Sequence, residues 1–260
     1  MRLCGYQPQY FPRLHYMNRV LQSDVYEISD YVQFVKKHAY ELPDGTTKRG
    51  KSYQAHTIIK QVQGTQFLAV PTKGELLPIN KTPIDYSRDW ARDHLKSIEI
   101  AYRKAPNFEK FYPEIEKILT TTYDSIGELT VKTSLWGVAR LISYDPLPFE
   151  TFTIKNINEF IKNNNPYRLK TVFLASESKV PAPTKGNTNE WCIALCKYAN
   201  ADEYIYGGTS HNAYMNLEKF NNSGIKTVLQ DWQIKEYQQQ YRKAGFLPNL
   251  SVIDLSLIHI

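Results

Sequence analysis

Apolar positions in the first part of the chain follow the spacing of a strand, then of a helix, then of a strand again. Residues 3–6 form a short apolar run, which predicts a strand. Leu14 and Met17 begin a series at helical spacing, which predicts a helix over residues 14–22. Residues 24–30 alternate in hydrophobicity and predict a second strand. Strand, helix and strand in this order have the length of one βαβ unit with a right-handed crossover.

The middle of the chain combines a polar hairpin with mainly helical patterns. The Pro-Asp-Gly sequence at residues 43–45 predicts a turn, and residues 66–71 predict a strand. Residues 87–122 are predicted to be mainly helical, with prolines as breaks or first-turn residues. A further helix is predicted over residues 126–142.

Strand and helix patterns alternate through the rest of the chain. The predicted strands cover residues 147–154, 170–176, 203–206 and 225–229, and the predicted helices cover residues 157–164, 189–198 and 213–221. Alternation of this kind predicts an α/β fold, with a mostly parallel sheet and flanking helices in Rossmann-like layers. The central helical stretch is an addition to that plan.

Residues 1–260 are predicted to form a single domain, either in one piece or in two lobes. In the two-lobed arrangement, residues from about 1–85 and 165–260 form the α/β layer, and residues from about 86–164 form a mainly helical lobe. The sequence contains no internal repeat and no low-complexity linker that would mark a sharper boundary.

Composition and cysteine usage predict a cytoplasmic protein. Hydrophobic residues make up 42% of the chain, and no apolar run approaches the roughly 20 residues of a membrane span. The N-terminus lacks the apolar centre of a signal peptide. Three cysteines, an odd number, suit a reducing compartment. Cys192 and Cys196 are four residues apart, so they share one face of a helix, where small side chains pack.

A net charge of +6 suits an anionic partner but does not select one. The charge fits an enzyme that handles phosphorylated or nucleotide-linked substrates, and it also fits a nucleic-acid binder. No zinc-finger, helix-turn-helix or RNA-recognition signature accompanies it. Nineteen tyrosines add flat faces with hydroxyl groups, which suit sugar rings, bases and wet interfaces. We expect a small anionic substrate and no membrane contact, with nucleic acid as a further possibility.

Ligands of open α/β sheets bind where loops leave the carboxyl ends of the strands. This rule selects residues 7–15, residues 30–38, Lys185 with the glycine that follows it, and the turn at Gly207 and Gly208. All of these loops lie on one rim if their strands are parallel.

The first loop offers Gln7, Tyr10 and His15, which carry an amide, a phenol and an imidazole. Prolines stiffen the loop and lower its entropy loss on binding, and the N-terminus of the following helix favours an anion. The alternative is a structural turn whose aromatic rings pack inward.

The second and third loops contribute charge. Asp30 is followed by Lys36, Lys37 and His38, and lysines near a carboxylate can bind phosphate or polarise a carbonyl. Lys185 precedes a predicted helix, although no Walker motif surrounds it. The alternative is a set of solvated surface lysines. No histidine or cysteine spacing typical of a metal site occurs, and no cofactor is indicated.

Short motifs run in a fixed order along nearly the whole chain. They are YQPQYFP at residues 6–12, DYVQFVKK at 30–37, LAVP at 68–71, YRKAPNF at 102–108, YIYGG at 204–208, YQQ at 237–239 and FLPNLSVID at 246–254. Together they resemble the WbqC-like family of bacterial surface-glycan loci, including O-antigen clusters. The resemblance implies transfer of an acyl or aminoacyl group to an amino sugar. It adds Tyr237 and Gln239 to the expected substrate-binding residues, and Asp254 to the expected catalytic carboxylates.

The chain departs from the family pattern in three places. His15 stands where the family usually has a glycine, and residues 41–54 look like an insertion. An arginine-asparagine pair usually follows the double lysine, whereas His56 and Thr57 occupy the nearest position here. These differences bear on the substrate more than on the fold.

The first functional hypothesis is a transferase that acts on a nucleotide-linked or otherwise phosphorylated amino sugar. Its expected roles are anion binding by Lys36, Lys37 and Lys185, ring contact by Tyr10, general-base action by His15 or His38, and orientation by Asp30 and Asp254. The donor is an acyl or aminoacyl group whose carrier the sequence does not identify. A nucleotidyl-transfer or nucleotide-activating enzyme is the second hypothesis. A non-catalytic module that binds nucleic acid or a partner is the third.

Overall fold

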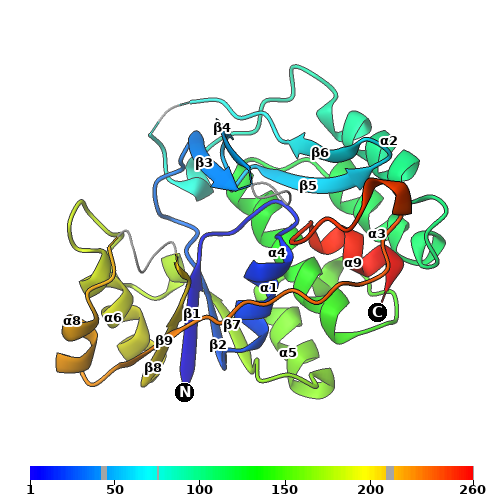
Figure 1. Cartoon of the computed structure of the whole chain (residues 1–260). Helices are drawn as coiled ribbons and strands as arrows, with labels where there is room; N and C mark the ends of the chain where they lie inside the picture. Colours follow the sequence, from blue (N-terminus) through cyan, green and yellow to red (C-terminus); the bar gives the residue numbers. More distant parts are fainter. Residues whose placement is uncertain (42–45, 75, 209–213, 260) are drawn as a thin grey trace.

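A five-stranded parallel sheet forms the centre of the computed structural model (Figure 1). The structure describes residues 1–41, 46–74, 76–208 and 214–259. In order across the sheet, the strands are β7 (Thr171–Leu174), β2 (Val25–Ile28), β1 (Arg2–Tyr6), β8 (Glu203–Tyr206) and β9 (Lys226–Leu229). All four neighbouring pairs are parallel, which confirms the predicted α/β fold.

The strand order has one reversal. From β1 the chain adds β2 and then β7 on one side, and it later returns to add β8 and then β9 on the other side. Such a doubly wound sheet has a topological switch point between its first and fourth strands, here β1 and β8. The loops that follow these two strands leave the carboxyl edge of the sheet at this point.

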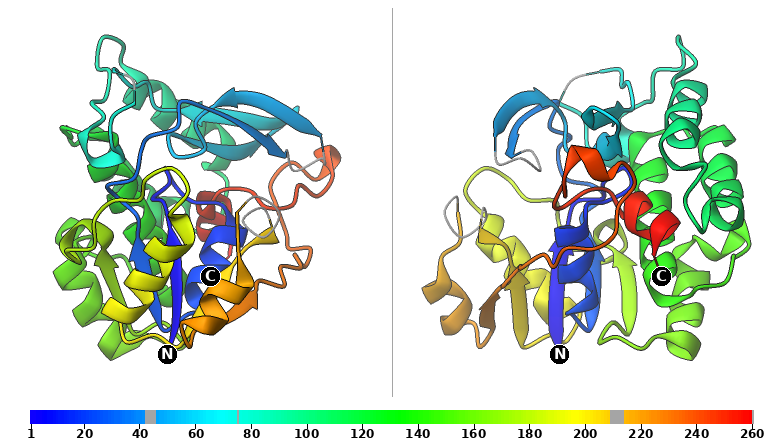
Figure 2. Two further views of the ribbon diagram at one scale, coloured as in Figure 1. Left: turned by 90° about the vertical axis from the view of Figure 1, so that its left-hand side faces the viewer. Right: turned by 45° about the vertical axis from the view of Figure 1, so that its right-hand side comes forward.

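Helices cover both faces of the sheet (Figure 2). One face carries α1 (Leu14–Leu21), α4 (Ile126–Ile142) and α5 (Ile154–Asn164), and the other carries α6 (Thr188–Tyr198) and α8 (Leu217–Asn222). Side chains alternate between the two faces along each strand. Cys4 and Tyr26 therefore join the core on the α1 side, whereas Leu3 and Val25 pack with the two α6 cysteines.

The helical part of the core continues through α2 (Trp90–Tyr102), α3 (Phe108–Thr120) and the C-terminal α9 (Val252–Ile258). Two antiparallel hairpins lie above the carboxyl edge of the sheet (Figure 1). Their strands are β3 (Lys37–Glu41) with β4 (Thr47–Lys51), and β5 (His56–Gln61) with β6 (Gly64–Ala69). Strand β5 differs from the sequence prediction, which has no strand at residues 56–61.

The predicted strand over residues 147–154 is wrong. The chain forms a 3-10 turn at Phe149–Thr151, and α5 begins at Ile154. Pro146 and Pro148 have no backbone N–H to give to a sheet ladder. The hydroxyl of Thr153 accepts a hydrogen bond from Asn156 N at 3.3 Å, and this N-cap starts the helix three residues earlier than predicted.

Two further predictions differ from the structure or lie outside it. The helix predicted over residues 213–221 is α8, which begins only at Leu217, after Asn216 caps it through a 3.2 Å hydrogen bond from Lys219 N. Residues 43–45 and 213 lie outside the described residues. None of the helices within the described ranges combines the length and apolar character needed to cross a membrane.

Candidate active site at the sheet switch point

The four loops chosen from the sequence follow parallel strands, so they share the carboxyl edge of the sheet. Gln7 follows β1, Asp30 follows β2 and Gly207 follows β8. Lys185 lies between β7 and α6 and is exposed. The prediction of a common rim therefore agrees with the topology of the sheet.

The first two loops are joined by the side chain of Gln54. Its Nε2 donates to Gln7 Oε1 at 2.6 Å, and its Oε1 accepts from Val35 N at 3.0 Å. The Tyr53 hydroxyl also donates to Gln7 Oε1. The exposed Lys36 and Lys37 follow Val35 directly, so this network fixes the start of the lysine pair near the end of β1. His38 belongs to the same loop prediction, and its side chain lies outside the described part of the structure.

His15 is held in one tautomer by Asn249. Asn249 Oδ1 lies 3.0 Å from His15 N, a group that can only donate, so this amide atom is an acceptor. The same oxygen lies 2.9 Å from His15 Nδ1, which must therefore carry a proton. The unprotonated Nε2 then faces the Tyr6 hydroxyl at 3.3 Å. The arrangement is a chain from phenol to imidazole to amide.

The imidazole of His15 is neutral. Burial and the positive charges of Arg13 and Arg19 together lower its pKa to about 3, and the hydrogen bond to Asn249 only partly opposes them. Burial also raises the pKa of the Tyr6 hydroxyl, although Arg19 opposes that shift. At neutral pH the pair is a protonated phenol that donates to an unprotonated ring nitrogen.

Arg19 is a site residue that the sequence reasoning missed. It follows His15 by four positions on α1, so the two side chains lie on one face of the helix. Its Cζ lies 4.5 Å from the centre of the Tyr6 ring, and its Nε donates to Gln230 Oε1 at 2.8 Å. The four-residue spacing from His15 could have indicated Arg19 as a site residue, but only if the face of α1 that meets β1 had been known.

Gly207 makes room for the guanidinium of Arg19. A Cβ atom at position 207 would lie 2.9 Å from Cζ of Arg19 and closer still to Nη2. A Cβ atom at Gly208 would meet no heavy atom within 4 Å. The two glycines that follow β8 therefore differ: the first allows a close approach, and the second is exposed.

The N-terminus of α1 is capped by the C-terminal part of the chain. Leu14 N donates to Leu250 O at 3.1 Å, and His15 N donates to Asn249 as described. An anion at the helix N-terminus would need these backbone N–H groups as hydrogen-bond donors. The expectation of an anion there is therefore not supported, and the polar groups of the switch point lie along the His15 and Arg19 face instead.

Two of the predicted residues make internal contacts at this edge. Tyr10 is fully buried, and its hydroxyl lies 2.9 Å from His94 Nδ1, so it packs inward rather than against a ligand. Asp30 is also buried, and its carboxylate accepts from Ser176 N at 3.0 Å, from Ser176 Oγ at 2.6 Å and from Asn80 Nδ2 at 3.2 Å. Asp30 ties β2 to the segment that follows β7.

Asp254, Tyr237 and Gln239 gather in a separate buried cluster. Asp254 accepts hydrogen bonds from the hydroxyls of Tyr102 and Tyr237, both at 2.8 Å. Gln239 Oε1 accepts from Lys60 Nζ at 3.1 Å. Burial raises the pKa of Asp254 to about 6, although both tyrosines and Lys60 oppose the shift. This cluster fastens the C-terminal segment to α2 and β5, and does not include His15.

Burial disfavours the charged forms of Glu27 and of two cysteine thiols below the rim. Burial raises the pKa of the Glu27 carboxyl well above its ordinary value, and Ser29 Oγ donates to its Oε2 at 3.0 Å. Burial raises the pKa of the Cys4 and Cys192 thiols to about 12. Neither thiol has the lowered pKa of a cysteine nucleophile.

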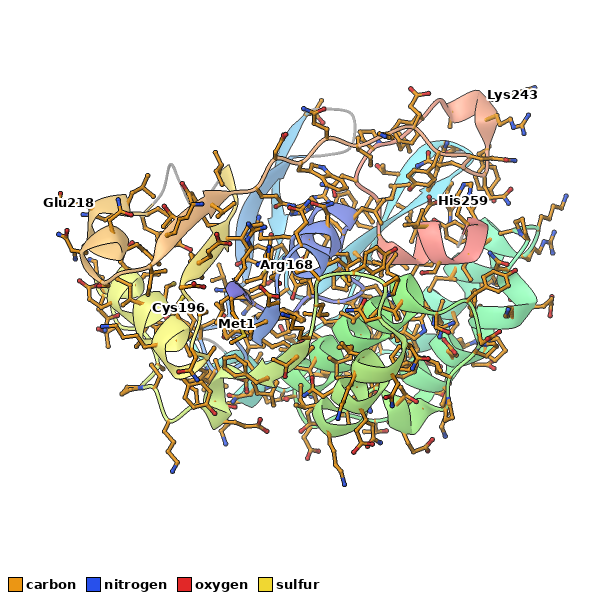
Figure 3. The ribbon with its side chains drawn as sticks, turned by 90° about the horizontal axis from the view of Figure 1, so that it is seen from below. Met1, Arg168, Cys196, Glu218, Lys243 and His259 are labelled. Carbon is orange, nitrogen blue, oxygen red and sulfur yellow. The ribbon has the colours of Figure 1, made fainter. Side chains whose placement is uncertain are left out.

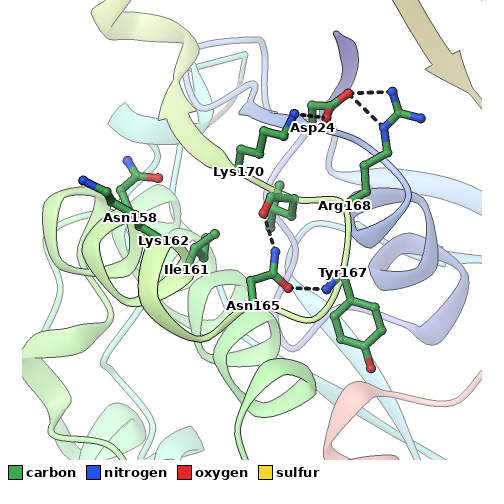
Figure 4. A pocket seen from close by; sticks show the side chains of 9 residues that line it. Asp24, Asn158, Ile161, Lys162, Asn165, Tyr167, Arg168 and Lys170 are labelled. Carbon is green, nitrogen blue, oxygen red and sulfur yellow. Dashed lines mark hydrogen bonds and ion pairs between the residues drawn. The ribbon is translucent and has the colours of Figure 1, made fainter.

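A cavity of about 820 Å³ lies at the opposite, amino edge of the sheet (Figure 4). Its polar groups are used internally: Arg168 Nε and Lys170 Nζ lie 2.9 and 3.0 Å from the Asp24 carboxylate. Burial opposes the shift, but hydrogen bonds from Arg168 and Arg2 hold the pKa of Asp24 well below its usual range. Seen from below, Arg168 lies near Met1, at the start of β1 (Figure 3). The cavity therefore surrounds a structural ion-pair cluster.

The fold is that of a doubly wound α/β protein, and polar side chains gather at the switch point of its sheet. The model of the WbqC-like protein family matches residues 7–259, and the chain belongs to that family. No curated protein and no solved structure matches the chain. The comparisons therefore identify the family without assigning an activity.

Proposed function

We propose that this protein is a transferase that moves an acyl or aminoacyl group onto the amino group of a nucleotide-linked or phosphorylated sugar. The observation that carries the proposal is the hydrogen-bonded chain of Tyr6, His15 and Asn249 at the switch point. It presents a phenol and an unprotonated imidazole at the edge where sheets of this type bind ligands. The assignment to surface-glycan synthesis, O-antigen included, rests on the family resemblance.

The proposed reaction forms one bond and breaks one bond. The acceptor amine attacks the donor carbonyl, the new bond joins nitrogen to carbonyl carbon, and the bond from that carbon to the leaving group breaks. The amine loses a proton, which Tyr6 and His15 carry to the departing group. His15 holds that proton only briefly, because burial and the two arginines disfavour its charged form.

Charge on the rim supports an anionic substrate. Lys36, Lys37 and Lys185 are exposed at the same edge of the sheet and would attract the phosphate groups of a nucleotide-linked sugar. Gln7 already accepts hydrogen bonds from Tyr53 and Gln54, so we propose that it positions the loops of the rim rather than binding the substrate by itself. The roles proposed for His38 and Gly208 stay predictions.

The proposal is tested by mass spectrometry of the acceptor. A UDP-linked amino sugar is incubated with acetyl-coenzyme A or an aminoacyl thioester, and the acceptor is expected to gain the mass of the acyl group. Tyr6→Phe removes the hydroxyl next to His15, and we expect the rate to fall by about 10² or more. Tyr198→Phe is the matched control, because Tyr198 is a half-exposed tyrosine on α6.

Full activity of Tyr6→Phe would remove the proposed role of the chain of Tyr6, His15 and Asn249. Release of pyrophosphate from ATP, without acyl transfer, would replace the proposal with nucleotide activation. Binding of nucleic acid that weakens steeply with salt, with no small-molecule turnover, would favour the binding-module hypothesis.

A further inference from the structure

Arg19 is a buried cation without an acidic partner in the described part of the chain. Its side chain is 7% exposed, and charged groups are rarely buried this far unless they are paired. Arg140, which is fully buried, follows that rule: its Nε lies 3.3 Å from Glu114 Oε2. No ion pair of this kind is found for Arg19 among the described residues, and residues 209–213, which follow Gly208 in sequence, contain no Asp or Glu.

The surroundings of Arg19 fix the direction of its guanidinium. Arg19 Nε donates a hydrogen bond to Gln230 Oε1 at 2.8 Å, and the ring of Tyr6 lies against the planar face of the Arg19 guanidinium. Gln230 is itself held by His15 O and Asn18 Oδ1, each 2.9 Å from its Nε2. The Nη atoms meet the chain at Gly207, where β8 ends. The group is therefore positioned from three sides at the carboxyl ends of β1 and β8.

We infer that Arg19, seated against Gly207, binds a phosphate oxyanion of the substrate at the switch point. This inference rests on the proposed function, because only that function makes the bound anion a substrate. It adds the protein group that would bind the phosphate. A guanidinium whose Nε is occupied still offers its two Nη groups to a pair of oxygens. Gly207 acts as a positioning residue, since a side chain there would occupy the place of Nη2.

The local charge favours phosphate over a single carboxylate. Arg13 adds a second positive charge close enough to lower the pKa of His15, and His15 itself is neutral. The exposed Lys36, Lys37 and Lys185 extend the positive charge along the same rim. An anion with more than one charge, such as a phosphate or diphosphate, matches this distribution better than a carboxylate with one charge.

The test is calorimetric titration of the whole protein with pyrophosphate, with acetate as the carboxylate probe, at constant ionic strength. We expect wild type to bind pyrophosphate more tightly than acetate. Gly207→Ala is expected to weaken pyrophosphate binding at least about tenfold, and Arg19→Gln at least as much. Arg92→Gln removes the charge of an exposed arginine on α2, which is not part of the rim, so it should change affinity less than about twofold.

Three results overturn the inference: no pyrophosphate binding by wild type, equal binding by Gly207→Ala, or tighter binding of acetate. If the variants fail to fold, hydrogen exchange of wild type decides, because bound pyrophosphate must protect residues 203–208 and the α1 peptide. Absence of that protection equally overturns the inference. Titration needs no donor and no turnover, so phosphate binding without acyl transfer leaves the subsite in place and removes only the proposed function.

Discussion

At the scale of single residues, the chemistry of the rim depends on which groups the surroundings keep neutral. Imidazole is ordinarily half protonated near pH 6.5, but desolvation and the charges of Arg13 and Arg19 lower the pKa of His15 to about 3, so it remains unprotonated. Asn249 decides which nitrogen carries the proton, and its own backbone has φ +56°, a conformation that asparagine tolerates better than most residues.

A substitution at Asn249, the hydrogen-bond partner of His15, should raise the pKa of His15. Asn249→Asp keeps an acceptor and tolerates the positive φ, but it places a carboxylate beside the ring, which favours the charged imidazole. We expect the pKa of His15 to rise by one unit or more above about 3, measured by ¹⁵N NMR of labelled histidine. In Asn249→Gly, the acceptor is removed and both neutral tautomers should appear. An unchanged spectrum in both variants would contradict the assigned tautomer.

At the scale of elements, capping residues decide where helices begin. Ser125 Oγ accepts from Glu128 N at 3.2 Å, and Glu128 Oε2 accepts from Asp124 N at 3.1 Å. This reciprocal arrangement resembles a capping box and starts α4, the longest helix of the structure. Helix α4 packs on α1, the helix that carries His15 and Arg19, so the position of α4 also supports these two residues.

Ser125→Ala removes the N-cap acceptor of α4. The expected loss is about 1 kcal/mol of the free energy of unfolding, because one helix N–H loses its partner. Urea unfolding followed by circular dichroism measures it. Ser125→Asp retains an acceptor and should stay close to wild type. A loss of equal size in both variants would show that the hydroxyl contributes through some contact other than the cap.

At the scale of the whole molecule, the C-terminal segment completes the site of the N-terminal loop. Val252 N donates to Pro12 O at 2.8 Å, and Ser251 Oγ donates to Phe11 O at 3.1 Å. Asn249 then reaches His15. Asp254 holds this segment by accepting from Tyr102 of α2 and from Tyr237.

Asp254 should make stability depend on pH. Its pKa is about 6 in the folded protein, above its ordinary value of 3.8, so folding favours the protonated form. Its contribution is fully present below about pH 4 and is lost as pH rises through 6, by on the order of 3 kcal/mol. Urea unfolding at several pH values should show that slope in wild type and lose it in Asp254→Asn. Asp145→Asn, at an exposed aspartate, should keep the slope.

Local sequence patterns were enough to predict most of the sheet. The strand patterns of β1, β2, β8 and β9 and the helical spacing of α1 and α4 are local properties, and the structure contains these elements. The pattern failed at residues 147–154, where two prolines prevent sheet pairing. It also missed β5, whose polar residues are buried through tertiary contacts.

The candidate site shows the same distinction between local patterns and tertiary contacts. Sequence alone determined the α/β alternation, the common rim of its loops, and the presence of Gln7, His15 and Gly207 on that rim. Only the tertiary structure decided that Tyr10 and Asp254 are buried in other clusters, that Asn249 sets the tautomer of His15, and that Arg19 lies against Gly207. Periodicity reports which face of an element is apolar, but contacts between residues far apart in the sequence depend on how the elements pack.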